Sequence, residues 1–277
     1  MSDSNVGARK NRNIRDNIFV LNAVTNSILK GQSEAIDVQV FDVEKCFDAL
    51  WMQECINDLA DTGFLNDKLS LLFLENQNAQ IAIKTSNGIS RRELINNVVM
   101  QGTVWGSLCC TATMDKLGQL HYMNENLLYK YKGTVDIPSL GMVDDVLSIQ
   151  KCSMDAVKAN ATINAFIESK KLTFSRDKCR RIHISKKKHG DNAACPELKI
   201  HNDKMEDSVR EKYLGDVIDN TGNIRATIED RKNRGYALAT EIMAILEEIP
   251  LGRYTMEIGL QLRQAMLINR MLFYSGA

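Results

Sequence analysis

The stretch that decides the fold is residues 139–149, Ser-Leu-Gly-Met-Val-Asp-Asp-Val-Leu-Ser-Ile. Two adjacent aspartates, Asp144 and Asp145, stand between short apolar runs, which predicts a β-hairpin with the acids at its turn. Carboxylates beside so much apolar surface are costly unless they are hydrogen-bonded, paired or bound to a metal. The stretch therefore indicates a chemical site as well as a fold.

A second candidate strand, residues 35–41, is also followed by an acid, Asp42. If this strand pairs with the hairpin, the carboxylates of Asp42, Asp144 and Asp145 converge at one rim of a sheet. At neutral pH the negative charges of such a cluster repel one another, and a bound divalent cation is the simplest way to offset this repulsion. Hard oxygen ligands suit Mg²⁺ or Mn²⁺ rather than zinc. The alternative role for Asp42 is to cap the helix that follows it.

Length and composition set the broad class. The chain has 277 residues, enough for one large domain or two smaller ones with a sizeable core. Its composition, 44% hydrophobic and 25% charged, is typical of a folded globular protein. The 35 basic residues equal the 35 acidic ones, so the global charge does not indicate a polyanionic partner. A local basic groove remains compatible with zero net charge.

Cysteine usage and the termini bear on the compartment. The seven cysteines include no CxxC pair, which favours buried, reduced thiols in an intracellular protein of the nucleus or cytoplasm. The first residues are polar and basic, unlike a secretory signal, and no apolar run approaches the roughly 20 residues of a membrane helix. We therefore expect neither secretion nor membrane insertion. The abrupt ends of the sequence indicate a fragment.

The remaining periodicity predicts a mixture of helices and strands. Apolar residues at helical spacing cover residues 16–29, 44–60, 67–76, 107–124 and 154–170, and helix resumes from residue 224. Alternating runs predict strands at 128–135, 180–185 and 212–218, and a strand pair at 80–85 and 93–100. This order favours an α+β fold, in which an antiparallel sheet carries helices packed on one face and a helical C-terminal part follows.

Several blocks, in order along the chain, carry a resemblance to a known family. The blocks are residues 12–16, 42–48, 101–102, 142–145, 172–178 and 212–215. Together they resemble the polymerase domain of reverse transcriptases, specifically those of non-LTR (LINE-type) retrotransposons. Met142 stands where that family carries an aromatic residue before its paired aspartates. The resemblance covers roughly residues 7–275 and implies a right-hand polymerase palm with partial fingers and a partial helical thumb.

The resemblance implies roles for the acidic cluster. Asp42, Asp144 and Asp145 would be the catalytic metal ligands, with Asp42 and Asp144 as the principal ones. Two Mg²⁺ ions (or Mn²⁺) would then assist nucleotidyl transfer to a primer 3′-end. Lys178 would act as the general acid that protonates the leaving pyrophosphate. The alternative for Lys178 is a solvated lysine at a strand end.

Five further residues acquire binding roles from the same resemblance. Phe47 would sit under the sugar and reject a 2′-hydroxyl, although a core phenylalanine is an equal alternative. Gln101 and Gly102 would let the backbone approach the nucleotide closely, unless Gly102 is only a turn glycine. Tyr213 and Gly215 would hold the primer terminus, or else form a sheet edge.

The resulting interpretation is an RNA-directed DNA polymerase whose partners are an RNA template, a DNA primer and deoxynucleoside triphosphates. Residues 1–205 would form partial fingers and palm, and residues 206–277 the primer-grip region and partial thumb. A truncated, catalytically inactive retroelement remnant that keeps the palm is the alternative. An RNA-templated RNA polymerase is a third possibility, which Phe47 argues against because RNA synthesis must admit a 2′-hydroxyl.

Overall fold

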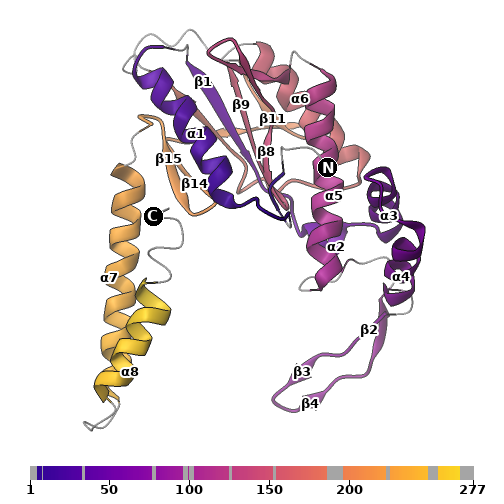
Figure 1. Cartoon of the computed structure of the whole chain (residues 1–277), viewed down its shortest axis with the longest axis vertical. Coiled ribbons are helices and arrows are strands. Elements are labelled where there is room, and N and C mark those ends of the chain that lie inside the picture. The colour runs from indigo at the N-terminus through magenta and orange to yellow at the C-terminus, as the bar shows by residue number, and fades with distance from the viewer. Residues whose placement is uncertain are drawn as a thin grey trace. The chain divides into compact units, whose positions relative to one another are not determined.

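The protein divides into two compact units, Met1–Ser208 (unit 1) and Val209–Ala277 (unit 2). Figure 1 shows the chain in a computed structural model. The residues that the structure describes are 5–7, 9–32, 35–76, 79–95, 99, 103–124, 127–151, 154–185, 196–222, 225–248 and 255–268.

Unit 1 is built on a five-stranded sheet with β1 at its centre. Its order is β13 (Glu206–Asp207), β10 (Arg180–Ile184), β1 (Ile36–Phe41), β9 (Asp145–Lys151) and β8 (Leu140–Met142). β1 is antiparallel to both neighbours, and β8 and β9 form the predicted hairpin. Only β13 runs parallel to the strand beside it. The pairing of two acid-bearing strands that was predicted from the sequence is therefore present.

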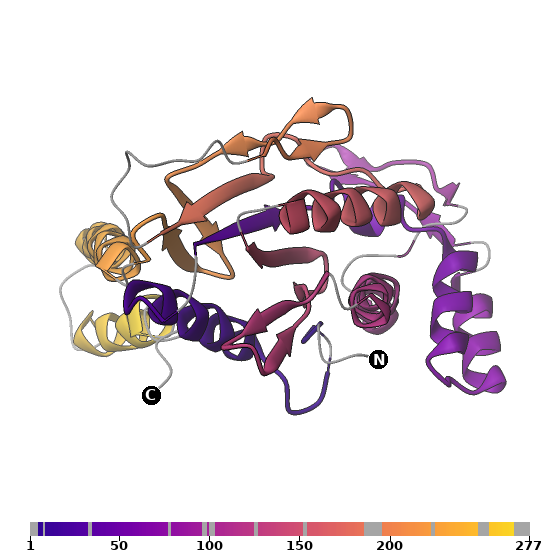
Figure 2. The same cartoon turned by 90° about the horizontal axis from the view of Figure 1, so that it is seen from above.

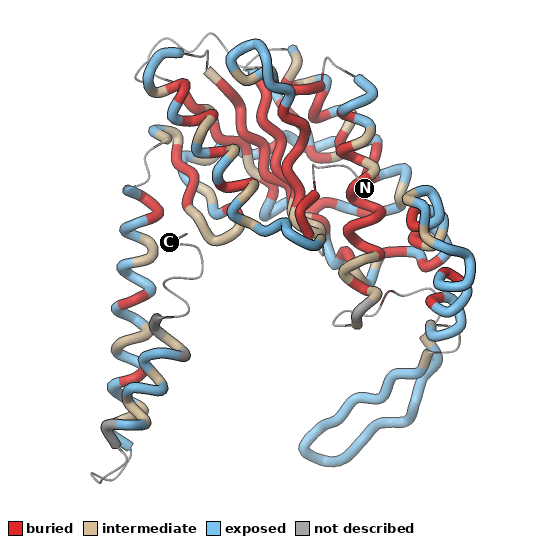
Figure 3. Tube along the Cα trace, in the orientation of Figure 1, coloured by how far each residue is buried: buried red, intermediate tan, exposed pale blue. Residues whose placement is uncertain are grey.

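Helices cover the sheet on more than the one face that was expected. α6 (Met154–Ser169) packs on one side, where the Gln39 side chain donates to the Ala156 carbonyl. α1 (Ile14–Leu29) and α5 (Val104–Met123) contact β8 and lie on the other side in Figure 2. All six residues of β1 are consequently buried (Figure 3). The α+β class and the palm sheet agree with the prediction, and the second covered face adds to it.

Burial of both faces requires partners for the polar residues of β1. Asp37, fully buried, pairs with Arg181 at 2.8 Å and with His183 at 3.0 Å, both on the adjacent strand β10. Asn160 of α6 donates to Gln39 at 3.1 Å. A buried charge persists only where such partners satisfy it. Along β1, apolar residues packed in the core thus alternate with polar residues whose side chains are hydrogen-bonded or ion-paired.

The helix predicted over residues 44–60 is wrong as a single element. The structure has α2 (Cys46–Ala49) and α3 (Met52–Asp61), separated at Leu50 and Trp51, whose backbones are extended. Leu50 is buried in the core of unit 1, so the break allows this side chain to pack inward. Tertiary packing overrides the helical periodicity at that point.

The strand pair predicted near residues 80–100 is an exposed double hairpin. β2 (Ala79–Ile81) pairs with β5 (Glu93–Ile95), and β3 (Lys84–Thr85) pairs with β4 (Gly88–Ile89) around a turn at Ser86 and Asn87. α4 (Asn66–Asn76) precedes this arm, as predicted. Figure 3 shows the arm exposed along its length. Its short strands bury too little surface to form a core of their own.

Residues 128–135 also differ from the prediction of one strand. They contribute to a two-stranded hairpin of β6 (Tyr129–Tyr131) and β7 (Val135–Ile137), which turns at Lys132 and Gly133, both with positive φ. A second small hairpin, β11 (Lys199–Ile200) with β12 (Asp203–Lys204), precedes β13. Glycine adopts the left-handed conformation of such turns without a steric cost.

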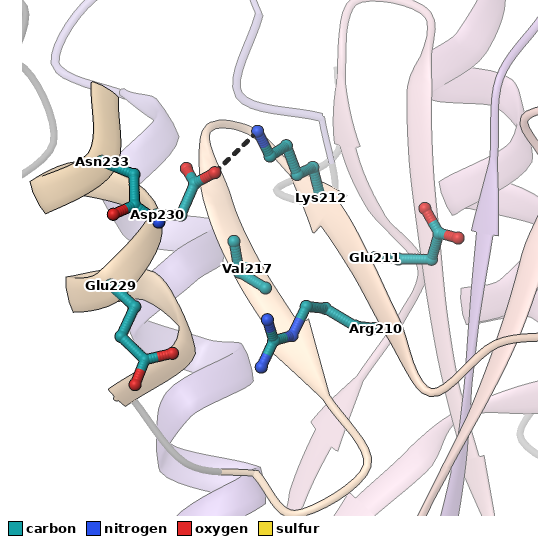
Figure 4. A pocket seen from close by; sticks show the side chains of 7 residues that line it. All are labelled: Arg210, Glu211, Lys212, Val217, Glu229, Asp230 and Asn233. Carbon is teal, nitrogen blue, oxygen red and sulfur yellow. Dashed lines mark ion pairs between the residues drawn. The ribbon is translucent and has the colours of Figure 1, made fainter. Parts of the chain in front are cut away.

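Unit 2 begins with another hairpin where one strand was predicted. β14 (Arg210–Tyr213) pairs with β15 (Asp216–Asp219), and the turn residues Leu214 and Gly215 both have positive φ. The helices α7 (Arg225–Glu247) and α8 (Thr255–Leu262) and the π-helical η2 (Arg263–Ile268) follow. A pocket of about 390 Å³ lies between the hairpin and α7, and there Lys212 pairs with Asp230 at 2.8 Å (Figure 4).

Candidate active site

The register of the sheet brings Asp42 and Asp145 to the same rim. In the antiparallel pairing of β1 with β9, Phe41 lies opposite Val146, so the residue that follows β1 leaves the sheet beside the residue that precedes Val146. Those two residues are Asp42 and Asp145. Asp145 in turn pairs with Met142 of β8, which leaves Asp144 in the turn of the hairpin. Two strand ends separated by about one hundred residues therefore deliver the acids to one place.

The pKa values of the hairpin acids show that they share one electrostatic environment. Burial, together with the negative charges of Asp144 and Asp42, raises the pKa of Asp145 to about 6. Burial is also the main cause that raises the pKa of Asp144, with Asp42 adding to it. Repulsion among partly buried carboxylates has this effect, and a cation placed among them relieves it.

Lys178 lies beside this cluster. Its amino group is 3.1 Å from the carboxylate of Asp42, and its side chain is two-thirds exposed. The hydrogen bond to Asp42 is the main cause that raises the pKa of Lys178, so its amino group keeps its proton at neutral pH. A protonated amine at the rim is in the state that a proton donor requires.

A short β-bridge just before Lys178 in the sequence fixes the position of this lysine. Phe174 forms an antiparallel bridge with Val43, and the Ser175 N–H donates to the Asp42 carbonyl at 2.9 Å. The Phe174 ring also packs against Phe41 with 5.0 Å between ring centroids. Residues 172–178, which the sequence singled out as a block, are thus held against the end of β1.

Cys179 is a residue at this site that sequence reasoning did not assign. The Asp42 N–H donates to its sulfur at 3.4 Å, and the cysteine is buried. Burial raises the pKa of the Cys179 thiol to about 11, so it remains a neutral, inert thiol. Its contact supports the backbone of Asp42. A lone cysteine follows no spacing rule, and no sequence signal could have identified it.

The hairpin turn carries backbone strain next to the acids. Val143, which precedes Asp144, has a φ of 60°. A β-branched residue in the left-handed region is a steric outlier that costs on the order of 1–3 kcal/mol. Strain of this size persists only where neighbouring groups hold the backbone, and it is typical of functional sites.

The binding residues predicted from the sequence fall in three situations. Phe47 lies on α2, half-buried, and packs against the core of unit 1. Gln101 and Gly102 lie outside the described residues. In unit 2, Tyr213 is buried at the end of β14, and the Gly215 carbonyl accepts a hydrogen bond from Arg234 at 3.0 Å. The Tyr213 ring is therefore packed in the interior and not exposed at the surface.

The donor set fits a hard divalent cation. Within the described ranges, no group of three or more histidine, cysteine, aspartate or glutamate side chains is arranged to hold a metal ion. Mg²⁺, however, is usually bound through one or two carboxylates together with substrate phosphates and water, not in an all-protein cage. Paired aspartates with raised pKa values supply carboxylate ligands of that kind.

An antiparallel sheet with aspartates at the ends of its paired central strands is an arrangement that suits a metal-dependent nucleotidyltransferase of the polymerase class. The profile of the reverse transcriptase (RNA-dependent DNA polymerase) family matches residues 1–218, and the chain belongs to that family. This family uses divalent metal ions and binds an RNA template and nucleotides. No curated protein sequence matches the chain.

Solved telomerase structures share the fold. One is telomerase from Candida tropicalis in complex with a TWJ fragment of telomeric RNA, with a TM-score of 0.53 and 14% identity, covering 98% of this chain and 43% of that one. Another is apo telomerase from the same organism truncated from its C-terminal domain, at 0.52 and 15%, covering 79% and 40%. The chain therefore spans less than half the length of these proteins. Such low identity establishes a common fold alone.

The helices of the structure also bear on membrane insertion. Among the described residues, no helix combines the length and the apolar character needed to cross a bilayer.

Proposed function

We propose that this reverse transcriptase domain catalyses RNA-templated addition of deoxynucleotides to a DNA primer 3′-end. The observation that carries the proposal is the convergence of Asp42, Asp144 and Asp145 at one rim, as the strand register and the raised pKa values indicate. Unit 1 would supply the palm and partial fingers, and unit 2 the primer-grip region and partial thumb. The order of the sequence blocks favours a non-LTR retrotransposon origin.

Asp42 and Asp144 would hold Mg²⁺ or Mn²⁺, with Asp145 in support. Ions held there would supply a lowered pKa for the primer 3′-hydroxyl and positive charge beside the triphosphate. Lys178 would donate its proton to the leaving pyrophosphate, and its position beside Asp42 supports that role. Phe47, packed on the core, would present a rigid ring against a 2′-hydroxyl. Gln101 and Gly102 would lie under the incoming nucleotide.

Unit 2 would contribute to primer binding. The hairpin turn of Tyr213 and Gly215 would guide the primer terminus through its backbone.

Five cysteines are free and buried: Cys46, Cys55, Cys109, Cys110 and Cys179. Reduced thiols of this kind support an intracellular setting, the nucleus or the cytoplasm.

Primer extension tests the proposal directly. The assay combines an RNA template, a DNA primer, deoxynucleotides and Mg²⁺, and compares the natural chain with an Asp144→Ala, Asp145→Ala double variant. Asp136→Ala is the matched control, because Asp136 is an exposed acid on β7, which is not part of the five-stranded sheet that carries the cluster. Extension should persist in the control and disappear in the double variant.

Parallel arms separate the alternatives. Ribonucleotides in place of deoxynucleotides would support extension only if the chain were an RNA polymerase. Folded natural protein that binds a primer–template duplex but never extends it would show that the chain is an inactive remnant with a preserved palm.

A further inference from the structure

The segment of residues 5–7 lies against the hairpin that carries the paired aspartates. Asn5 forms a parallel β-bridge with Gly141 of β8, and the Val6 N–H donates to the Gly141 carbonyl at 3.0 Å. Asn17 of α1 donates to the same carbonyl at 2.9 Å. In Figure 1 the indigo chain before α1 runs to the end of β8 accordingly. The start of the chain is thus attached to the site.

The side chain of Asn5 contacts both backbone groups of one turn residue. Its Oδ1 accepts the N–H of Val143 at 3.1 Å, and its Nδ2 donates to the Val143 carbonyl, also at 3.1 Å. Oδ1 additionally accepts the N–H of Gly7 at 2.9 Å. Asn5 is only 2% exposed. A primary amide carries its donor and its acceptor on two separate atoms, so one asparagine side chain can bond both the N–H and the carbonyl of the same residue.

The residue that Asn5 holds is the strained one. Val143 has a φ of 60° and directly precedes Asp144, so its backbone orientation sets where the carboxylates of Asp144 and Asp145 point. Valine does not adopt this conformation by preference. The two hydrogen bonds from Asn5 restrain both peptide groups that flank the strained φ and ψ angles.

The close approach of the segment depends on glycine. A Cβ at Gly7 would meet the Val143 nitrogen at 2.6 Å and the Val143 Cγ2 at 2.7 Å. A Cβ at Gly141 would meet Nδ2 of Asn5 at 3.0 Å. A side chain at either position would crowd Asn5 or Val143, so the absence of a Cβ at Gly7 and Gly141 lets Asn5 reach the turn.

We propose that Asn5 is a positioning residue, which holds the Val143–Asp144 turn in its left-handed conformation and thereby places the paired aspartates for catalysis. This inference rests on the proposed function, because it assigns Asn5 a role at the same site. Asn5 touches neither substrate nor metal in this scheme and acts only through Val143.

The test compares three variants with the natural chain. Asn5→Ala removes the restraint, and Asn5→Ala with Val143→Gly replaces the strained valine by a residue that accepts positive φ without help. Asn160→Ala is the matched control, since Asn160 is a similarly buried asparagine whose hydrogen bonds join α6 to β1 and β11 and do not involve the hairpin. Single-nucleotide incorporation with Mg²⁺ and amide hydrogen exchange at Val143 are measured below each variant's melting temperature.

We expect Asn5→Ala to lower kcat by at least about tenfold, with primer–template affinity unchanged, and to speed exchange at Val143 by a similar factor. The added Val143→Gly should restore most of kcat, whereas Asn160→Ala should lower the melting temperature without this loss. Equal effects of Asn5→Ala and Asn160→Ala on kcat, or no recovery in the double variant, would overturn the proposal.

Failure of the proposed function is distinguishable from failure of this inference. If the natural chain incorporates no nucleotide, the polymerase assignment falls, while exchange at Val143 still decides whether Asn5 holds the turn. Unchanged exchange in Asn5→Ala would overturn the inference whatever the activity of the chain.

Discussion

Asp42 and Lys178 illustrate how single residues define the chemistry of this site. An exposed lysine and a half-buried aspartate in contact are ordinarily worth little as an ion pair. The pair matters for the protonation state of Lys178, because Asp42 keeps the Lys178 amine charged beside carboxylates suited to bind a cation.

Removal of the Lys178 amine should slow chemistry more than binding. We predict that Lys178→Ala lowers kcat for nucleotide incorporation by about 100-fold or more, since general acid catalysis contributes effects of that order. Lys178→Arg keeps the charge but holds its proton too tightly, so it should be nearly as slow. Pre-steady-state incorporation measures both variants. Full activity of the arginine variant would show that charge alone matters.

Phe47 decides between two sugars in the proposed site. We predict that Phe47→Val admits ribonucleotides, because a smaller side chain leaves room for the 2′-hydroxyl. The ratio of kcat/KM values for deoxynucleotides and ribonucleotides measures the effect. The neighbouring core residue Leu50→Val is the control for packing loss. Equal sugar discrimination in the Phe47 variant and the natural chain would leave Phe47 with a core role only.

At the scale of elements, α5 is tied to the catalytic hairpin by a buried histidine. His121, near the end of α5, accepts the Ser139 N–H through Nδ1 at 3.2 Å, just before β8 begins. Burial lowers the pKa of His121 to about 4. The folded state therefore disfavours the imidazolium that the unfolded chain accepts near pH 6.5.

This pKa shift predicts acid sensitivity. Between pH 6.5 and 4 the unfolded state binds more protons at this site, so the stability contributed by neutral His121 is lost as pH falls. From pH 7 to pH 5 the loss should be about 2 kcal/mol. Urea unfolding at both pH values, compared with His121→Gln, measures it. Equal pH dependence of the two proteins would contradict the prediction.

The hairpin of unit 2 offers a stabilising change. Leu214 has a φ of 50° in the turn before Gly215. Two-residue hairpin turns with positive φ favour Asn-Gly, and a leucine in the left-handed region costs about 1–2 kcal/mol. Leu214→Asn should thus raise stability by about 0.5–1 kcal/mol, as measured by denaturant midpoint. Leu214→Ala, which retains the steric cost, should not.

At the scale of the whole molecule, the hydrophobic core is distributed unevenly. The main cluster of buried side chains, from Phe41 to Met205, lies entirely within unit 1. The described residues of unit 2 form one small hairpin and the helices that follow it. A unit with its own core can fold alone.

Residues 1–208 should accordingly fold without unit 2. We predict a cooperative thermal transition by circular dichroism, with primer extension reduced because the proposed primer-grip hairpin is missing. Extension by residues 1–208 at the rate of the whole chain would argue against a primer role for unit 2. Loss of the cooperative transition would show that unit 1 depends on the rest of the chain.

The sequence by itself determined the sheet and the acids at its rim. Alternating β1, the paired aspartates of the hairpin and the block at Lys178 are local patterns, because strand period and turn chemistry depend on near neighbours. Only the tertiary structure decided the break at Leu50, the partners of Asp37, the contact of Cys179 with Asp42 and the hold of Asn5 on Val143. The last joins residues 138 apart in the chain, and contacts at such separation arise from packing, which no local period encodes.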